Sequence, residues 1–134
     1  MTVNDELEAL YQRDGLLIPE KVVDFARDPQ TVLHECFDWN DSSAGEKWRH
    51  EQARNIIRVS VEYSPKLNKD TRVWISLPSD RLQGGGYRKV VDVLQSSKKD
   101  EMLAAARAEM TNFIKRFRDI EEMAGVIREM KSAA

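Results

Sequence analysis

The sequence contains a single cysteine, Cys36, among its 134 residues. One cysteine excludes an intramolecular disulfide and a four-cysteine zinc site, so we expect a protein of a reducing compartment. The chain also lacks a run of about 18 apolar residues that could span a bilayer, and its acidic start has no positively charged, apolar leader. We therefore expect a cytoplasmic protein that has no membrane partner.

Motifs for catalysis, cofactors and metals are missing as well. The triple glycine, residues 84–86, is not followed by the Gly-Lys-Ser/Thr ending of a phosphate-binding loop, and we interpret it as a hinge. The metal-competent side chains that lie close in sequence match no zinc spacing: His34, Cys36, Asp38, Asp41 and His50. No histidine is placed beside Cys36 as a general base. We expect no catalytic residue, no cofactor and no metal, and hence a non-enzymatic protein.

Charge is distributed unevenly beneath a formal net charge of only −2. Residues 1–41 carry 3 basic and 10 acidic side chains, residues 42–99 carry 12 and 6, and residues 100–134 carry 6 and 7. The corresponding net charges are −7, +6 and −1. A local excess of lysine and arginine can bind a polyanion even in a mildly acidic protein.

Three helical segments are predicted in the acidic first third. Thr2 can cap a helix whose apolar residues have 3/4 spacing and which ends before Gly15. A second helix begins at Pro19 and ends at Asp28-Pro29. A third covers residues 31–37, with Cys36 on its apolar face.

A longer helix is predicted from Ala44 to about Arg58, with a capping box formed by Ser43 and Glu46. Its apolar residues can share one side: Ala44, Trp48, Ala53, Ile56 and Ile57. Its basic residues recur at helical spacing on another side: Lys47, His50, Arg54 and Arg58. The helix is therefore amphipathic with a basic outer edge.

The pattern then changes to a period of two. Residues 59–63 and 72–77 alternate between apolar and polar side chains, which predicts two strands with one core-facing side. In the second strand Val73, Ile75 and Leu77 face the core and Trp74 faces away. The loop between the strands carries Lys66 and Lys69 and is short enough for an antiparallel hairpin. Residues 87–94 are interpreted as a further short strand or helical turn.

Two helices, a basic helix and a hairpin with lysines follow the element order of a winged helix-turn-helix, which binds DNA. On this interpretation the DNA-binding residues are Lys47, Arg49, His50, Arg54, Arg58, Lys66, Lys69 and Arg72. The alternative is a solvated helix face, in which Glu51 pairs with Lys47 and Arg54 at helical spacing. Phe37, Trp39 and Trp48 could stack on bases, but large aromatic residues beside a helix start favour a role in the core.

The last third has the most regular pattern. Apolar residues alternate at steps of three and four along a predicted helix of about 30 residues: Leu103, Ala106, Met110, Phe113, Phe117, Ile120, Ala124 and Ile127. We expect this seam to form a dimer or a higher oligomer. Two alternatives are a helical hairpin folded at Gly125 and a seam covered by the N-terminal helices.

Several segments resemble a family of small uncharacterised proteins encoded by bacteriophages and prophages. The similar segments are residues 17–23, 26–29, 33–34, 37–41, Ala44 and 52–58, which include Pro19-Glu20, Phe37-Asp38-Trp39-Asn40-Asp41 and Gln52-Ala53-Arg54-Asn55-Ile56-Ile57-Arg58. Family members usually have Trp-Asp-Asp where this chain has Trp39-Asn40-Asp41. The family has no settled activity, so the resemblance implies a phage-related origin, in an infected or lysogenic bacterium, and no mechanism.

Together these patterns predict an α+β protein. Residues 1–95 form a helical cluster with a hairpin that resembles a winged helix, and residues 96–134 form a long C-terminal oligomerisation helix. The predicted function is non-enzymatic DNA binding, either regulatory or architectural. The competing prediction is a module that binds a host or phage protein, as an inhibitor or assembly factor.

Overall fold

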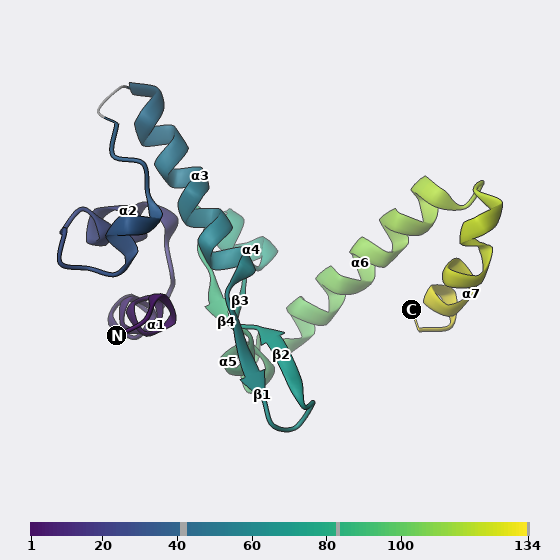
Figure 1. The fold of residues 1–134 in the computed structure, drawn as a ribbon. Coiled ribbons are helices and arrows are strands. Elements are labelled where there is room, and N and C mark those ends of the chain that lie inside the picture. Colours follow the sequence, from purple (N-terminus) through teal and green to yellow (C-terminus); the bar gives the residue numbers. More distant parts are fainter. Residues whose placement is uncertain (41–42, 83, 134) are drawn as a thin grey trace.

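The computed structural model describes residues 1–40, 43–82 and 84–133 (Figure 1). Its helices are α1 (Val3–Asp14), α2 (Pro19–Ala26), η1 (Leu33–Cys36), α3 (Ser43–Val59), α4 (Pro78–Arg81), α5 (Val90–Leu94), α6 (Lys99–Phe117), η2 (Glu121–Met123) and α7 (Ala124–Ala133). Its strands are β1 (Val61–Ser64), β2 (Lys69–Arg72), β3 (Trp74–Ile75) and β4 (Arg88–Lys89). Helices beside two small antiparallel sheets, β1–β2 and β3–β4, confirm the α+β class.

The hydrophobic core lies where α1, α2, η1 and α3 meet β3. It consists of Leu7, Leu10, Tyr11, Leu17, Val22, Val23, Ala26, Leu33, Phe37, Ala53, Ile57, Val73 and Trp74. Thr2 caps α1 as predicted, since its side chain accepts the Asp5 N–H. Gly15 ends α1 in the left-handed conformation, at φ 75°, and donates its N–H to the Tyr11 carbonyl.

The third predicted helix is only the short 3₁₀ turn η1. The buried carboxylate of Glu6 accepts the N–H groups of Val32 and Leu33, at 3.0 and 2.8 Å. Glu6 belongs to α1, so a side chain of another helix satisfies the free N–H groups at the start of η1. The two bonds also hold Leu33 in the core. Cys36, which the sequence places on an apolar face, is exposed.

Helix α3 covers the predicted range, but its apolar side is shorter than expected. Ala53 and Ile57 are fully buried, whereas Ala44 is exposed and Trp48 is 50% exposed. Neither Ala44 nor Trp48 belongs to the core cluster, and the first turns of α3 extend past α2 (Figure 1). The side chain of Ser43, assigned to the predicted capping box, lies outside the described part of the chain.

The predicted hairpin is present; its predicted core face is wrong for the first strand, whereas Val73 and Leu77 of the second predicted strand are buried as expected. Strands β1 and β2 pair in the register from Val61↔Arg72 to Ser64↔Lys69, around a turn at residues 65–68. Val61 and Tyr63 are exposed, because this two-stranded ribbon projects from the body (Figure 1), and Val59, the last residue of α3, is exposed as well. Alternating side chains on a projecting hairpin have solvent on both faces.

The second predicted strand is divided between two sheets. Strand β2 ends at Arg72, and Trp74 and Ile75 pair instead with Lys89 and Arg88 of β4. Trp74, expected to face away from the core, is buried with its ring edge against Tyr11, at 5.1 Å between ring centroids. Residues 87–94 contain both predicted elements, the strand β4 followed by α5.

The connection between α2 and α3 differs from that of a helix-turn-helix. It covers residues 27–42 and includes η1, whereas a helix-turn-helix joins its two helices through a turn of three or four residues. The similarity to a winged helix is therefore limited to the element order and to the hairpin that directly follows α3.

The long C-terminal helix is interrupted earlier than expected. Helix α6 ends at Phe117, and α7 folds back toward it (Figure 1). A helical hairpin, one of the two alternatives to a single long helix, is what forms, but it folds between Phe117 and Ala124 and not at Gly125, which lies within α7. Because of this reversal α7 lies beside α6, and Ile127 of α7 is buried.

Within the described ranges, no helix has the length and apolar content needed to cross a membrane.

The contrast between Ile57 and Val59 provides a test of this fold. Ile57 is 0% exposed and Val59 is 73% exposed, although both are aliphatic residues at the end of α3. We expect Ile57→Ala to lower the free energy of unfolding by about 2–5 kcal/mol, because it leaves a cavity. The matched Val59→Ala change should alter it by less than about 0.5 kcal/mol. Urea denaturation measures both, and equal losses would contradict the arrangement.

Candidate functional site

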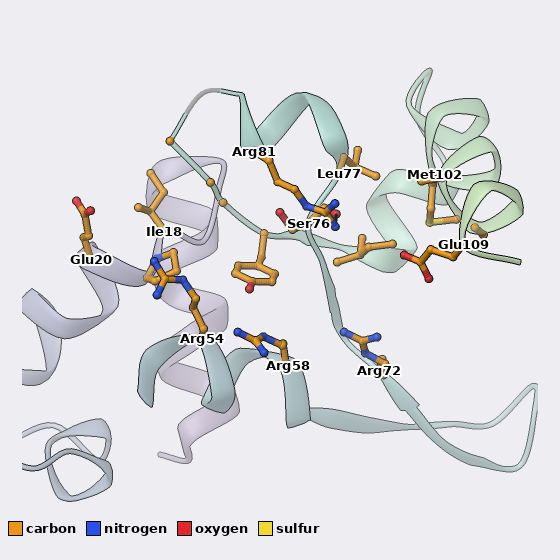
Figure 2. Close-up of a pocket in the computed structure, with 18 of the residues that line it drawn as sticks. Ile18, Glu20, Arg54, Arg58, Arg72, Ser76, Leu77, Arg81, Met102 and Glu109 are labelled. Carbon is orange, nitrogen blue, oxygen red and sulfur yellow. Dashed lines mark hydrogen bonds between the residues drawn. The ribbon is translucent and has the colours of Figure 1, made fainter. Parts of the chain in front are cut away.

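A pocket of about 560 Å³ opens between the end of α3, strand β2, the segment from Ile75 to Tyr87, and α6. Four arginines line it: Arg54 and Arg58 from α3, Arg72 from β2 and Arg81 from α4. Arg54, Arg58 and Arg72 lie along one side and Arg81 reaches in from the other, while Glu20 and Glu109 lie at the two ends (Figure 2). We call this the arginine pocket.

Helical periodicity explains why two of these arginines reach the same pocket. Arg54 and Arg58 are four residues apart, which places them one above the other on α3. Each follows directly after a fully buried residue, Ala53 or Ile57. Burial of those two positions fixes the rotation of α3, so the arginines emerge at the edge of the core.

Arg54 and Arg58 share a single carboxylate. Glu51 contacts Arg54 at 3.2 Å and Arg58 at 3.3 Å, and both arginine side chains are nearly half exposed. Interaction with the Tyr87 hydroxyl, and more weakly with Glu51, raises the pKa of Arg58. Exposed ion pairs of this kind contribute at most about 1 kcal/mol. An incoming anion can therefore compete with Glu51 at little cost.

The other two arginines have even fewer acidic partners. Arg81 donates to the backbone carbonyl of Ser76 at 3.2 Å. The guanidinium of Arg72 makes no ion pair or hydrogen bond within the described part of the chain. Two of the four cations are thus available to a ligand without displacing a carboxylate.

The remaining walls of the pocket are mainly apolar: Ile18, Pro19, Ile75, Leu77, Tyr87, Met102, Leu103, Ala105 and Ala106. Tyr87 is fixed by two backbone hydrogen bonds to Leu17, both 2.8 Å long. Glu101 at the start of α6 accepts the backbone N–H and the hydroxyl of Ser79, each at 2.9 Å. These bonds hold α6 against α4 and so position one wall of the pocket.

Arg49 was predicted to bind DNA, and the structure contradicts this. It is 4% exposed and donates to the backbone carbonyls of Asp38 and Asn40, at 3.1 and 2.8 Å. Its guanidinium also pairs with Glu46 at 2.9 Å and lies 5.2 Å from the centroid of the Trp39 ring. Arg49 therefore fastens the chain that precedes α3 onto the helix.

The other predicted DNA-binding residues lie apart from the arginine pocket. Lys47 is exposed in the first half of α3, and His50 contacts Glu46 at 3.3 Å. Lys66 and Lys69 are exposed at the turn of the hairpin and do not line the arginine pocket. Of the eight residues predicted from sequence, the structure gathers Arg54, Arg58 and Arg72.

The predicted oligomerisation seam is divided among three environments. Leu103 and Ala106 line the arginine pocket. Ala106 also borders a groove between α6 and α7, together with Met110 and Phe113. The remaining seam residues are Phe117 at the end of α6, Ile120 in the turn, and Ala124 and buried Ile127 in α7. The seam is not one continuous stripe, because the chain reverses after Phe117.

The aromatic residues near the start of α3 have different roles. Phe37 is buried, and Trp39 stacks on His34 at 4.9 Å between ring centroids and donates its indole N–H to the His34 carbonyl. Trp48 is exposed, which contradicts its predicted place in the core.

Among the described residues, no group of three or more metal-competent side chains converges on one point. Asp41 lies outside the described residues.

Sequence reasoning missed Arg81, Tyr87 and the glycines at 84–86 as parts of the site. They reach the pocket because β3 pairs with β4 and because Tyr87 bridges to Leu17. These pairings join segments far apart in the sequence, so no periodic pattern of residues predicts them. The triple glycine is a recognisable feature of this segment, but we interpret it from sequence as a hinge and not as part of a pocket.

Comparison with known proteins gives no match: no family model, no curated protein and no solved structure is significantly similar to this chain. The resemblance to phage-encoded proteins therefore stays a prediction.

The ion pairs around Glu46 predict a loss of stability in acid. Hydrogen bonds from Arg27 and then Arg49 lower the pKa of Glu46 from 4.5 to about 2. The folded protein thus binds this proton less readily than the unfolded chain does. The contribution of ionised Glu46 to the free energy of unfolding is complete above about pH 4.5 and is lost as the pH falls through about 2.

We expect the melting temperature of the parent protein to fall more steeply below pH 4.5 than that of Glu46→Gln, which cannot lose this charge. Circular dichroism melts across the acid range measure the difference. Glu62→Gln, which changes an exposed carboxylate on β1, is the control and should follow the parent. Parallel curves for Glu46→Gln and the parent would show that the network does not stabilise the fold.

Proposed function

We propose that the protein binds nucleic acid without catalysis, as a regulatory or architectural factor, through the arginine pocket and the adjoining hairpin β1–β2. The observation that carries the proposal is the convergence of Arg54, Arg58, Arg72 and Arg81, from three separate elements, on one pocket. Guanidinium groups bind phosphate oxygens in a planar, two-point geometry, which favours a phosphate ligand.

The balance of charge at the site supports a polyanion. Four arginines face two lining carboxylates, Glu20 and Glu109, and Glu51 is shared between two of the cations. On the hairpin, Lys66, Lys69 and Arg72 exceed Glu62 and Asp70 by one positive charge. The acidic first third of the chain forms α1 and α2, so most of its carboxylates lie on other elements.

Removal of two pocket arginines tests this proposal. We expect Arg54→Ala combined with Arg58→Ala to weaken binding of a fluorescent oligonucleotide at low salt by about 10-fold or more, because the variant cannot form charge-assisted hydrogen bonds to phosphate there. The slope of log affinity against log salt should fall by about 0.7–0.9 for each phosphate that the protein no longer neutralises.

The control is Arg118→Ala combined with Arg128→Ala, which removes the same charge from exposed residues that do not line the pocket. It should bind nearly as the parent does. Equal losses in the two double variants would mean that only total charge matters, and unchanged binding in both would show that the pocket is not the binding site.

A second function, self-assembly, is favoured by the C-terminal helices. None of the residues of α6 is buried, and Met110 and Phe113 border an open groove between α6 and α7. Glu109 and Arg116 both line this groove and lie seven residues apart on α6. A second copy docked antiparallel, with the two-fold axis midway between these two residues and close to Phe113, would place Glu109 near Arg116 of the partner.

Light scattering tests the assembly. We expect the parent to show twice the 15.5 kDa mass of one chain at micromolar concentration, and Phe113→Ser to shift it to a single chain because the apolar surface of the groove is interrupted. Val126→Ser, at an exposed position on α7 outside the seam, should remain assembled. A monomeric parent would exclude the groove as a self-association surface at these concentrations.

A further inference from the structure

We propose that the arginine pocket accepts one unpaired nucleotide, so that the ligand is single-stranded nucleic acid in preference to duplex. The proposal rests on the proposed function and specifies its substrate class. It assigns the phosphate to the arginine side of the pocket and the base to the apolar wall that includes Tyr87.

The size and the concavity of the site favour a nucleotide over a duplex. Its volume of about 560 Å³ falls within the range of pockets that enclose small ligands, roughly 300–1,000 Å³. A duplex presents phosphates on a convex surface and keeps its bases stacked inside. Only a nucleotide that is free of its partner strand can place a base inside such a pocket.

The two chemistries of the walls match the two parts of a nucleotide. Arg54, Arg58 and Arg72 lie together on one side (Figure 2), where they suit phosphate. Ile75 and Leu103 contribute apolar surface elsewhere in the same pocket. A site that only followed a duplex backbone would need the cations and not the apolar walls, whereas single-strand sites combine cations with stacking surfaces.

Tyr87 is well placed to contact the base. It is partly buried against the core, its backbone is held on both sides by Leu17, and its hydroxyl interacts with Arg58. A rigid ring beside a phosphate-binding guanidinium is the arrangement in which base stacking and phosphate binding occur together. Tyr87 is therefore the residue through which preference for a single strand is best tested.

The carboxylates at the ends of the pocket limit how a strand can enter. Glu20 and Glu109 lie at opposite ends (Figure 2), where a row of phosphates running along the whole pocket would be repelled. A strand that crosses the pocket and inserts one nucleotide places its phosphates near the arginines and away from both carboxylates. The charge pattern thus agrees with one inserted nucleotide rather than several.

The test compares a labelled 12-nucleotide single strand with the duplex of the same sequence, by fluorescence anisotropy across a salt series. We expect the single strand to bind about 10-fold more tightly. Tyr87→Leu should abolish most of this preference, because it removes the ring on which the base stacks. Tyr87→Phe retains the ring and should retain the preference.

Two further variants keep the result interpretable. Tyr63→Leu, on the exposed hairpin outside the pocket, is the matched control and should keep the preference. Ala106→Phe fills the pocket from an exposed position on α6, without removing any core side chain. It should abolish the single-strand preference even if Tyr87→Leu fails to fold.

Each outcome distinguishes this inference from the function on which it rests. Equal affinity for both forms, or a preference that survives Ala106→Phe, overturns the inference and leaves nucleic-acid binding intact. Loss of the preference in Tyr63→Leu alone places the base contact on the hairpin and also overturns it. Absence of salt-sensitive binding to either form refutes the proposed function itself. Binding of the mononucleotide dTMP without either oligonucleotide contradicts both.

Discussion

The rotation of helix α3 about its axis is the constraint on which both the core and the arginine pocket depend. Ala53 and Ile57 are fully buried against α2 and β3. Because Arg54 and Arg58 are each the next residue along the helix, they lie at the edge of the buried face, where the pocket opens. The apolar contacts and the basic site are therefore two consequences of one orientation.

A polar network holds the other end of α3 in place. Arg49 joins the helix to the preceding chain through the carbonyls of Asp38 and Asn40. Glu46 joins it to Arg27, just after α2, at 2.7 Å. Gly45 permits this arrangement, since a Cβ there would collide with the Asn40 carbonyl. With the core at one end and this network at the other, α3 is fixed along most of its length.

The sequence predicted most of the elements and part of the site, for identifiable reasons. Periodicity and caps located α1, α2 and α3, because these signals arise from residues close together in the chain. They also placed Arg54 and Arg58 on one stripe. Periodicity was wrong wherever an element lacked an apolar neighbour, as at Trp48 and on the hairpin residues Val61 and Tyr63, which are exposed.

What remained hidden depends on contacts between distant segments. The β3–β4 pairing and the Leu17–Tyr87 bridge bring Arg81 and Tyr87 to the pocket. No local pattern encodes either pairing. Arg49 shows the complementary error: its charge suggested a surface role, whereas backbone carbonyls and the Trp39 ring compensate for its burial. Charge alone does not distinguish a binding arginine from one that stabilises the fold.

The most direct test of the arginine pocket as the binding site is to map the contact surface by NMR during titration with an oligonucleotide. We expect the largest shifts in the ¹H–¹⁵N spectrum to cluster on the second half of α3, the end of β2 and the segment from Arg81 to Tyr87. Shifts confined to the first half of α3 or to α7, with these segments unchanged, would contradict that assignment.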